Sequence, residues 1–110
     1  PDTALVYASA AAVERAVLDH IDAGVRRVLL VGTAINDLDV TGLDMLRELR
    51  RTLAARGTTL YLCRVKLPVW QMLERAGVPA EFGDGHCFRT ERQAIAALID
   101  AHHAAAGVRP

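Results

Sequence analysis

The fold is decided by residues 25–63, VRRVLLVGTAINDLDVTGLDMLRELRRTLAARGTTLYLC. Val28–Val31 is an unbroken apolar run, which is typical of a strand that is buried on both faces of a sheet. Thr58–Cys63 alternates and then becomes apolar, which predicts a second strand. Between them a helix opens at Thr41, because leucines recur at helical spacing, and Gly57 is expected to end it. The leucines of this stripe are Leu43, Leu46, Leu49 and Leu53.

Strands and helices continue to alternate on both sides of this stretch. This alternation predicts an α/β layer sandwich with a mostly parallel central sheet, right-handed crossovers and about four covering helices. The chain is expected to form a single domain over residues 1–110, with a frayed tail at 103–110. Two further strands are predicted at Ala4–Tyr7 and His86–Phe88. Three further helices are also predicted. Ser9 caps the first, Pro68 opens the second and Gly77 and Pro79 close it, and Thr90 caps the third.

Composition excludes several classes of protein. The chain has 110 residues, which is room for one domain with one core. Its 13 basic and 13 acidic residues cancel, which argues against a dedicated nucleic-acid binder. The sequence shows neither a bilayer-spanning apolar run nor a leader peptide, so the chain as given is expected to be soluble. Cys63 and Cys87 are expected to be buried, reduced thiols, as suits a cytoplasmic protein.

The sequence offers little that could carry catalysis. It lacks metal-ligand spacing, the GxSxG elbow, the GxxxxGK[ST] phosphate loop and the GxGxxG motif. Asp37 and Asp39 could be imagined as a pair of catalytic carboxylates. Acidic residues in a loop before a helix more often cap that helix and favour its positive end, so capping is expected here. We therefore predict a protein that is not an enzyme and that carries no cofactor and no metal.

The loop that enters the leucine-striped helix is the candidate functional site. The first peptide N–H groups of a helix lack partners and carry partial positive charge, so this end can hold an anion, including a phosphate on Thr41 itself. We predict that Thr41 lies at or near the N-terminus of the helix and is a candidate phosphorylation site. The residues of this functional loop are Asn36, Asp37, Asp39, Val40, Thr41 and Gly42.

The order of motifs along nearly the whole chain resembles the STAS domain, shared by anti-sigma-factor antagonists and the cytoplasmic tails of SulP-type anion transporters. In that family an aspartate, a small residue, Ser or Thr, and Gly stand at the start of a helix; here they are Asp39-Val40-Thr41-Gly42. Residues 65–77, VKLPVWQMLERAG, resemble the transporter branch more than the antagonist branch. Further segments that resemble the family are Leu5–Ala10, Leu49–Gly57, Phe88 and Glu91–Leu98.

Two features depart from the family pattern. The family usually has another strand ahead of Ala4–Tyr7, so either the chain as given omits that strand or a partner supplies it. Antagonists that switch by phosphorylation typically carry serine where this chain has Thr41. The resemblance therefore implies the STAS-like layer sandwich more directly than it implies a switch at Thr41.

The resemblance implies a non-enzymatic regulatory and interaction domain at the cytoplasmic face of the inner membrane. It would belong to a SulP-like transporter of sulfate, bicarbonate or a dicarboxylate, whose transmembrane domain would be its partner. The alternative is a stand-alone anti-sigma-factor antagonist-like protein that binds a regulatory protein partner and is switched by phosphorylation at Thr41. A homodimer remains open. A nucleotide ligand is a weaker alternative, because the sequence shows neither a phosphate-cradling glycine loop nor a base-stacking aromatic.

One aromatic residue is a candidate contact residue. Trp70 lies off the apolar stripe of its helix, which is formed by Val69, Met72, Leu73 and Ala76. We therefore expect the indole to be partly exposed. A partly exposed tryptophan is a candidate for an interaction surface, whether with a partner protein or near a membrane.

Overall fold

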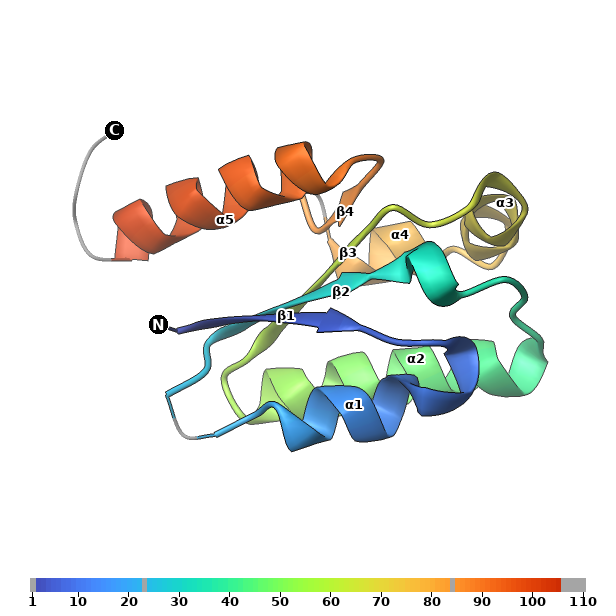
Figure 1. Ribbon diagram of the computed structural model, residues 1–110, viewed down its shortest axis with the longest axis horizontal. Helices are drawn as coiled ribbons and strands as arrows, with labels where there is room; N and C mark the ends of the chain where they lie inside the picture. Colours follow the sequence, from blue (N-terminus) through green and yellow to red (C-terminus); the bar gives the residue numbers. More distant parts are fainter. Residues whose placement is uncertain (1, 23, 84, 106–110) are drawn as a thin grey trace.

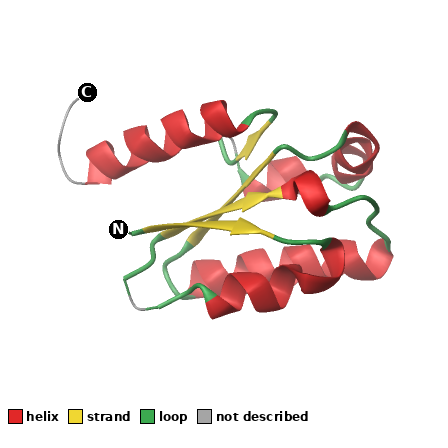
Figure 2. Cartoon of the chain, in the orientation of Figure 1, coloured by secondary structure: helices red, strands yellow, loops and turns green. Residues whose placement is uncertain are grey.

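The centre of the molecule is a parallel sheet of four strands. The computed structural model describes residues 2–22, 24–83 and 85–105. Strand order across the sheet equals order along the chain, and all three pairings are parallel (Figures 1 and 2). The mostly parallel α/β sandwich predicted from the sequence is confirmed. The strands are β1 (Thr3–Tyr7), β2 (Arg27–Val31), β3 (Thr59–Cys63) and β4 (Cys87–Phe88).

Helices cover both faces of this sheet. In Figure 1, α1 and α2 lie along one face and α5 lies along the other. Short 3-10 turns, η1 (Ala10–Ala12) and η2 (Gly32–Ala34), follow β1 and β2. The α-helices are α1 (Val13–Asp19), α2 (Val40–Ala55), α3 (Leu67–Arg75), α4 (Val78–Phe82) and α5 (Glu91–Ala105).

The core is divided by the sheet into a larger and a smaller apolar cluster. In β2, Val28 and Leu30 face the larger cluster, whereas Leu29 and Val31 face the smaller one beneath α5. All four side chains are fully buried, which explains why the strand is apolar at every position. The larger cluster also takes in the four stripe leucines of α2 and Val69, Leu73, Val78 and Phe82 from α3 and α4.

Helix α2 has the position and the buried face that the sequence predicted. Its four stripe leucines are at most 7% exposed. The helix ends at Ala55, and Gly57 follows with a φ of +77°, a left-handed conformation that glycine adopts without steric cost. The buried Thr58 hydroxyl then donates a hydrogen bond of 3.0 Å to the Val25 carbonyl oxygen and so ties the start of β3 to the chain entering β2.

The segment after α3 differs from the sequence-based expectation. Gly77, with a φ of +76°, does terminate α3. Pro79, however, does not close a helix but stands in the first turn of a new one, α4, where its missing N–H has no cost. Arg47 of α2 holds α4 in place: it donates to both carboxylate oxygens of Glu81 and, at 2.6 Å, to the Ala76 carbonyl oxygen.

The two ends of the chain also refine the prediction. Ser9 occupies the N-cap position of η1 without a side-chain capping bond, whereas Thr90 and Gln93 form a reciprocal capping box at the start of α5. Of the predicted frayed tail at 103–110, residues 103–105 form the last turn of α5 and residues 106–110 lie outside the described residues.

The cysteines are free thiols. Cys63 is buried and Cys87 is half-buried. Burial raises the pKa of each thiol to about 11, with the nearby Glu91 carboxylate adding to the effect at Cys63. Both side chains are therefore protonated and unreactive at neutral pH, as expected for cysteines that act as small apolar residues.

Replacing Leu53 tests the contribution of the α2 stripe to stability. Leu53 is fully buried, so Leu53→Ala is expected to lower the free energy of unfolding by about 2–5 kcal/mol. The matched control is Ile99→Ala on α5, where the side chain is 50% exposed and the loss should stay below about 1 kcal/mol. Urea denaturation followed by circular dichroism measures both, and equal losses would contradict this assignment of the core.

The Arg47–Glu81 pair predicts a specific dependence of stability on pH. Hydrogen bonds from Arg47 hold the pKa of Glu81 below its ordinary value. The ionised carboxylate therefore stabilises the fold above the pKa of an unfolded-state glutamate, and this contribution disappears as the pH falls through the lowered pKa. The melting temperature of Glu81→Gln should lie below that of the wild type at about pH 7 and approach it at about pH 3.

The control for this experiment is Glu74→Gln on α3, because Glu74 is exposed and enters no ion pair among the described residues. It should melt like the wild type at both pH values. A gap between wild type and Glu81→Gln that does not change with pH would show that the loss has another cause.

Candidate functional site

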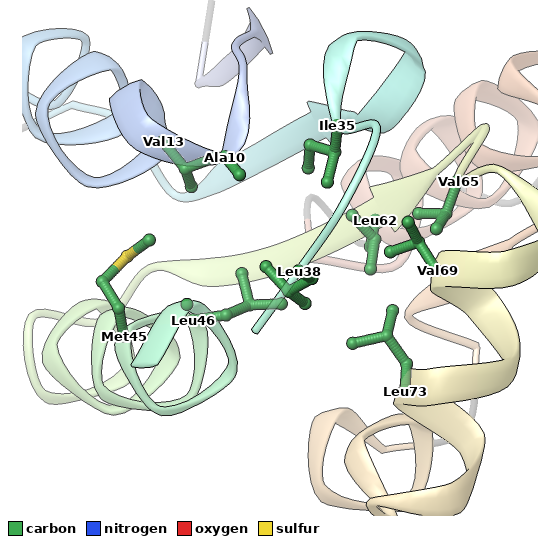
Figure 3. A pocket seen from close by; sticks show the side chains of 11 residues that line it. Ala10, Val13, Ile35, Leu38, Met45, Leu46, Leu62, Val65, Val69 and Leu73 are labelled. Atoms are coloured by element: carbon green, nitrogen blue, oxygen red, sulfur yellow. The ribbon is translucent and has the colours of Figure 1, made fainter. Parts of the chain in front are cut away.

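The functional loop leaves the C-terminal end of β2 and is fixed to the core by two apolar side chains. Ile35 and Leu38 are 4% and 6% exposed and point inward (Figure 3). The polar loop residues Asn36, Asp37 and Asp39 are exposed. Because Ile35 and Leu38 anchor the loop in the core, its polar side chains point outward from a fixed backbone.

The two aspartates of the loop have different structural roles. Asp39 is the N-cap of α2: its Oδ1 accepts a hydrogen bond of 2.8 Å from the Gly42 amide. The capping predicted from the sequence is therefore confirmed for Asp39. Asp37 does not cap the helix, because its carboxylate accepts from the Leu38 amide within the loop, at 2.8 Å. Both carboxylates are thus engaged by backbone amides.

Thr41 lies in the first turn of α2, where the sequence placed it. Val40 and Thr41 are the first two residues of the helix, and both side chains are exposed. Within the described part of the chain, the Thr41 hydroxyl forms no side-chain hydrogen bond that would make it an internal cap; Asp39 has that role. The hydroxyl is therefore open to solvent and to a modifying enzyme or a partner.

Gly42 is closely packed at the helix start. A Cβ atom at this position would lie 2.8 Å from Leu38 Cδ1 and 3.3 Å from Asp39 Oδ1. The glycine therefore lets the loop anchor and the capping carboxylate approach the helix together. This explains in physical terms why a glycine follows Thr41 in the motif.

Two hollows adjoin the loop, and only the outer one could receive a ligand or partner. The inner one, shown in Figure 3, is lined by apolar residues alone and has a volume of about 10 Å³, so it is a packing gap. The outer one is an open groove of about 390 Å³ between η1 and the start of α2. Its lining consists of Ala10, Ala11, Asp37, Leu38, Asp39, Thr41, Gly42 and Met45.

Lys66, which sequence reasoning missed, joins the site from the start of α3. Its Nζ donates a hydrogen bond to the Asn36 side-chain oxygen and so connects the functional loop to the next crossover. Asn36 in a loop and Lys66 just before a helix have no detectable pairing signal in one sequence. The contact follows from the parallel sheet, which brings the loops after β2 and β3 to the same edge.

Trp70 is separate from the groove. The indole is half-buried against the larger core cluster. It also lines a small surface hollow with Val65, Leu67, Phe88 and Arg89, which shares no residue with the groove at Thr41. The structure therefore places the two candidate contact regions on different parts of the surface.

The described residues contain no group of three or more His, Cys, Asp or Glu side chains that could hold a metal ion. Among the helices formed by residues 2–22, 24–83 and 85–105, none has the length and apolarity needed to cross a bilayer. The features of the site are thus an accessible hydroxyl, a capped helix start and an open groove.

The parallel α/β sandwich, with an aspartate-capped helix and an exposed threonine in its first turn, agrees with the motif order that resembles the STAS domain. The family model of the STAS domain matches residues 1–94. The chain therefore belongs to the STAS domain family. No curated protein matches the chain significantly.

Solved structures with the same fold include STAS domains of transporters. The chain is similar to the SulP transporter STAS domain from Vibrio cholerae, with a TM-score of 0.79, 21% identity, and coverage of 94% of this chain and 85% of that one. It is also similar to a sulfate transporter family protein from Wolinella succinogenes, with a TM-score of 0.78, 23% identity, and coverage of 92% and 88%.

A third similar structure is a whole transporter. Murine Solute Carrier 26 family member A9, an anion transporter in the inward-facing state, matches with a TM-score of 0.74 and 16% identity. The match covers 89% of this chain but only 18% of the transporter. At these identities the three structures establish the shared fold.

Replacing Asp39 tests its role as the cap of α2. Asp39→Ala is expected to lower the free energy of unfolding by about 0.5–2 kcal/mol, because the Gly42 amide loses its acceptor. Asp39→Asn keeps an acceptor oxygen and should retain most of the stability. Asp37→Ala is the matched control and should cost less, since Asp37 does not cap the helix. Equal losses for both alanine variants in urea denaturation would refute the distinction.

Proposed function

We propose that this chain is the non-enzymatic, cytoplasmic regulatory and interaction domain of a SulP-like anion transporter. The observation that carries the proposal is the capped helix start with the exposed Thr41, in a chain that belongs to the STAS family. The similar folds of the Vibrio cholerae and Wolinella succinogenes proteins support the transporter branch over a stand-alone antagonist. In this proposal residues 1–110 form one domain, and the transported ion is sulfate, bicarbonate or a dicarboxylate.

The principal partner in this proposal is the transmembrane domain of the same transporter. Support comes from murine Solute Carrier 26 family member A9, of which a fold like this one occupies 18%.

The groove beside Thr41 is the surface we assign to regulation, because it is open, rests on a rigid helix start and contains the exposed hydroxyl. Phosphorylation would place a dianion beside Asp39 and change both the charge and the shape of that surface.

Transport by the full-length protein tests the proposal. Cells lacking their own sulfate uptake should take up labelled sulfate, bicarbonate or a dicarboxylate when they express the whole protein that contains these residues. Removal of residues 1–110 should reduce the rate or the amount of transporter in the membrane. A full-length protein without membrane-spanning segments would overturn the transporter assignment.

Thr41→Glu, compared with Thr41→Ala, tests regulation through the hydroxyl. Neither variant should destabilise the fold, because Asp39 and not Thr41 caps the helix. A negative charge in the first turn should add roughly 0.3–1 kcal/mol at most. Thr41→Glu alone is expected to reduce transport or partner binding, through charge repulsion and altered shape. Melting temperature and transport rate are the two measurements.

A glutamate at the other end of the same helix, Ala54→Glu, controls for added charge, since Ala54 is also exposed. If Thr41→Glu and Thr41→Ala both keep wild-type transport, Thr41 is not a switch. If both melt markedly earlier, its role is structural.

A further inference from the structure

Four exposed cations gather where the strands end. Tyr7, Val31 and Cys63 are successive partners across β1, β2 and β3, and Cys63 pairs with Phe88 of β4. Arg64 and Arg89 follow this last pair directly, so they leave the sheet side by side at one edge. Lys66 and Arg92 flank them, Lys66 as the residue before α3 and Arg92 in the first turn of α5; all four are exposed.

Carboxylates only partly balance these cations. Glu91 accepts hydrogen bonds of 3.2 and 3.3 Å from the Tyr7 hydroxyl and lies 3.7 Å from Arg64 Nη1. Asp37 and Asp39 lie beyond Asn36, and their carboxylates accept from backbone amides. Lys66 donates to the side-chain oxygen of Asn36. Because this amide is neutral, the hydrogen bond does not balance the lysine charge. Of these four cations, Arg64 alone lies within ion-pair distance of a carboxylate among the described residues.

Apolar and amphipathic side chains lie among the cations. Leu67 is 54% exposed and Tyr7 is 57% exposed. The half-buried Trp70 lines a shallow hollow with Leu67, Phe88 and Arg89. Tryptophan and tyrosine are the residues enriched where protein meets lipid headgroups, because each has an apolar body and a polar tip. We call this set of residues the basic edge: Tyr7, Arg64, Lys66, Leu67, Trp70, Arg89 and Arg92.

The backbone at Arg64, in the middle of this surface, is in a left-handed conformation. Its φ of 56° is a left-handed conformation that costs a non-glycine residue free energy, and it is the only such residue among those described. Glycine would remove the strain, yet the position carries an exposed arginine. The Arg64 side chain is half-exposed and lies 3.7 Å from Glu91, so its guanidinium is accessible at this edge.

We infer that the basic edge docks on the anionic headgroup surface of a membrane. The chain as a whole is neutral, so attraction to an anionic surface would arise from this local excess and would also orient the domain. Lipid phosphates match arginine and lysine, while Leu67 and Trp70 can enter the headgroup layer. The cations come from four different elements or their ends, and Leu67 and Tyr7 are exposed at the same edge, which matches an extended anionic surface with an apolar layer beneath it. This inference goes beyond the proposed function, which names a transporter but no lipid contact.

Vesicle binding of the chain is the test, and Trp70, the single tryptophan, is the reporter. Phosphatidylcholine vesicles with about 30 mol% phosphatidylglycerol should shift its emission to the blue, and brominated lipid should quench it. Each cation near such a surface strengthens partitioning about fivefold, so these vesicles should bind at least about 100-fold more tightly than neutral ones. Raising the salt concentration from about 0.05 M to about 0.5 M should remove most of the binding.

Charge reversal identifies the surface. Lys66→Glu combined with Arg89→Glu should weaken binding at least about 100-fold, and Leu67→Ser should weaken it several-fold. The matched control is Arg51→Glu combined with Arg56→Glu, which makes the same charge change on exposed positions at the far end of α2. Circular dichroism verifies that each variant is folded. Sedimentation of wild-type chain with anionic vesicles, lost only in the basic-edge variants, supports the inference.

Three results would overturn it: equal binding to neutral and anionic vesicles, no binding to either, or equal loss in the control variant. The outcome is separate from that of the transport assay. A chain that binds anionic vesicles but whose full-length protein moves no anion would refute the proposed function and leave this inference standing. A working transporter whose domain ignores anionic vesicles would do the reverse.

Discussion

Burial of β2 on both faces of the sheet is the constraint on which the other elements depend. Val28, Leu29, Leu30 and Val31 are all fully buried, so helices must cover the strand from two sides. Parallel pairing then requires a crossover between successive strands. The carboxyl ends of the strands consequently meet at one edge of the sheet, and both the Thr41 groove and the basic edge are built there.

Rigidity distinguishes the Thr41 site from an ordinary surface loop. Ile35 and Leu38 anchor the loop in the core, and Asp39 fixes the first turn of α2. Gly42 allows the anchor and the cap to pack against the helix at the same point. A partner would therefore meet a preformed surface and lose little conformational entropy from the domain on binding. A covalent change at Thr41 would alter that surface without disturbing the fold beneath it.

The sequence predicted those elements whose signal is local and repeated. Helix α2 was predictable because its four leucines recur at helical spacing, and β2 because it is apolar throughout. Helix α4 was missed because Pro79 is compatible with both the end and the start of a helix, and the Arg47–Glu81 pair that holds it spans 34 residues. Asp37 was wrongly expected to cap the helix. Its carboxylate accepts from the Leu38 amide and that of Asp39 from the Gly42 amide, and the sequence alone does not distinguish these two geometries. The Asn36–Lys66 contact depends on strand register, which one sequence does not reveal.

The agreement between strand order and chain order has a consequence for how the molecule assembles. Each new strand adds to the growing side of the sheet, so the β-sheet can form in the order of synthesis without inserting a strand between two others. Helix α5 follows the last of these strands along the chain. The Tyr7 hydroxyl donates to the Glu91 carboxylate, and the His102 ring hydrogen-bonds the Asp2 carboxylate. These pairs lie 84 and 100 positions apart and are the most distant side-chain hydrogen bonds along the described chain. These contacts close the longest loops, so they carry the largest loop-closure entropy cost among the side-chain hydrogen bonds described.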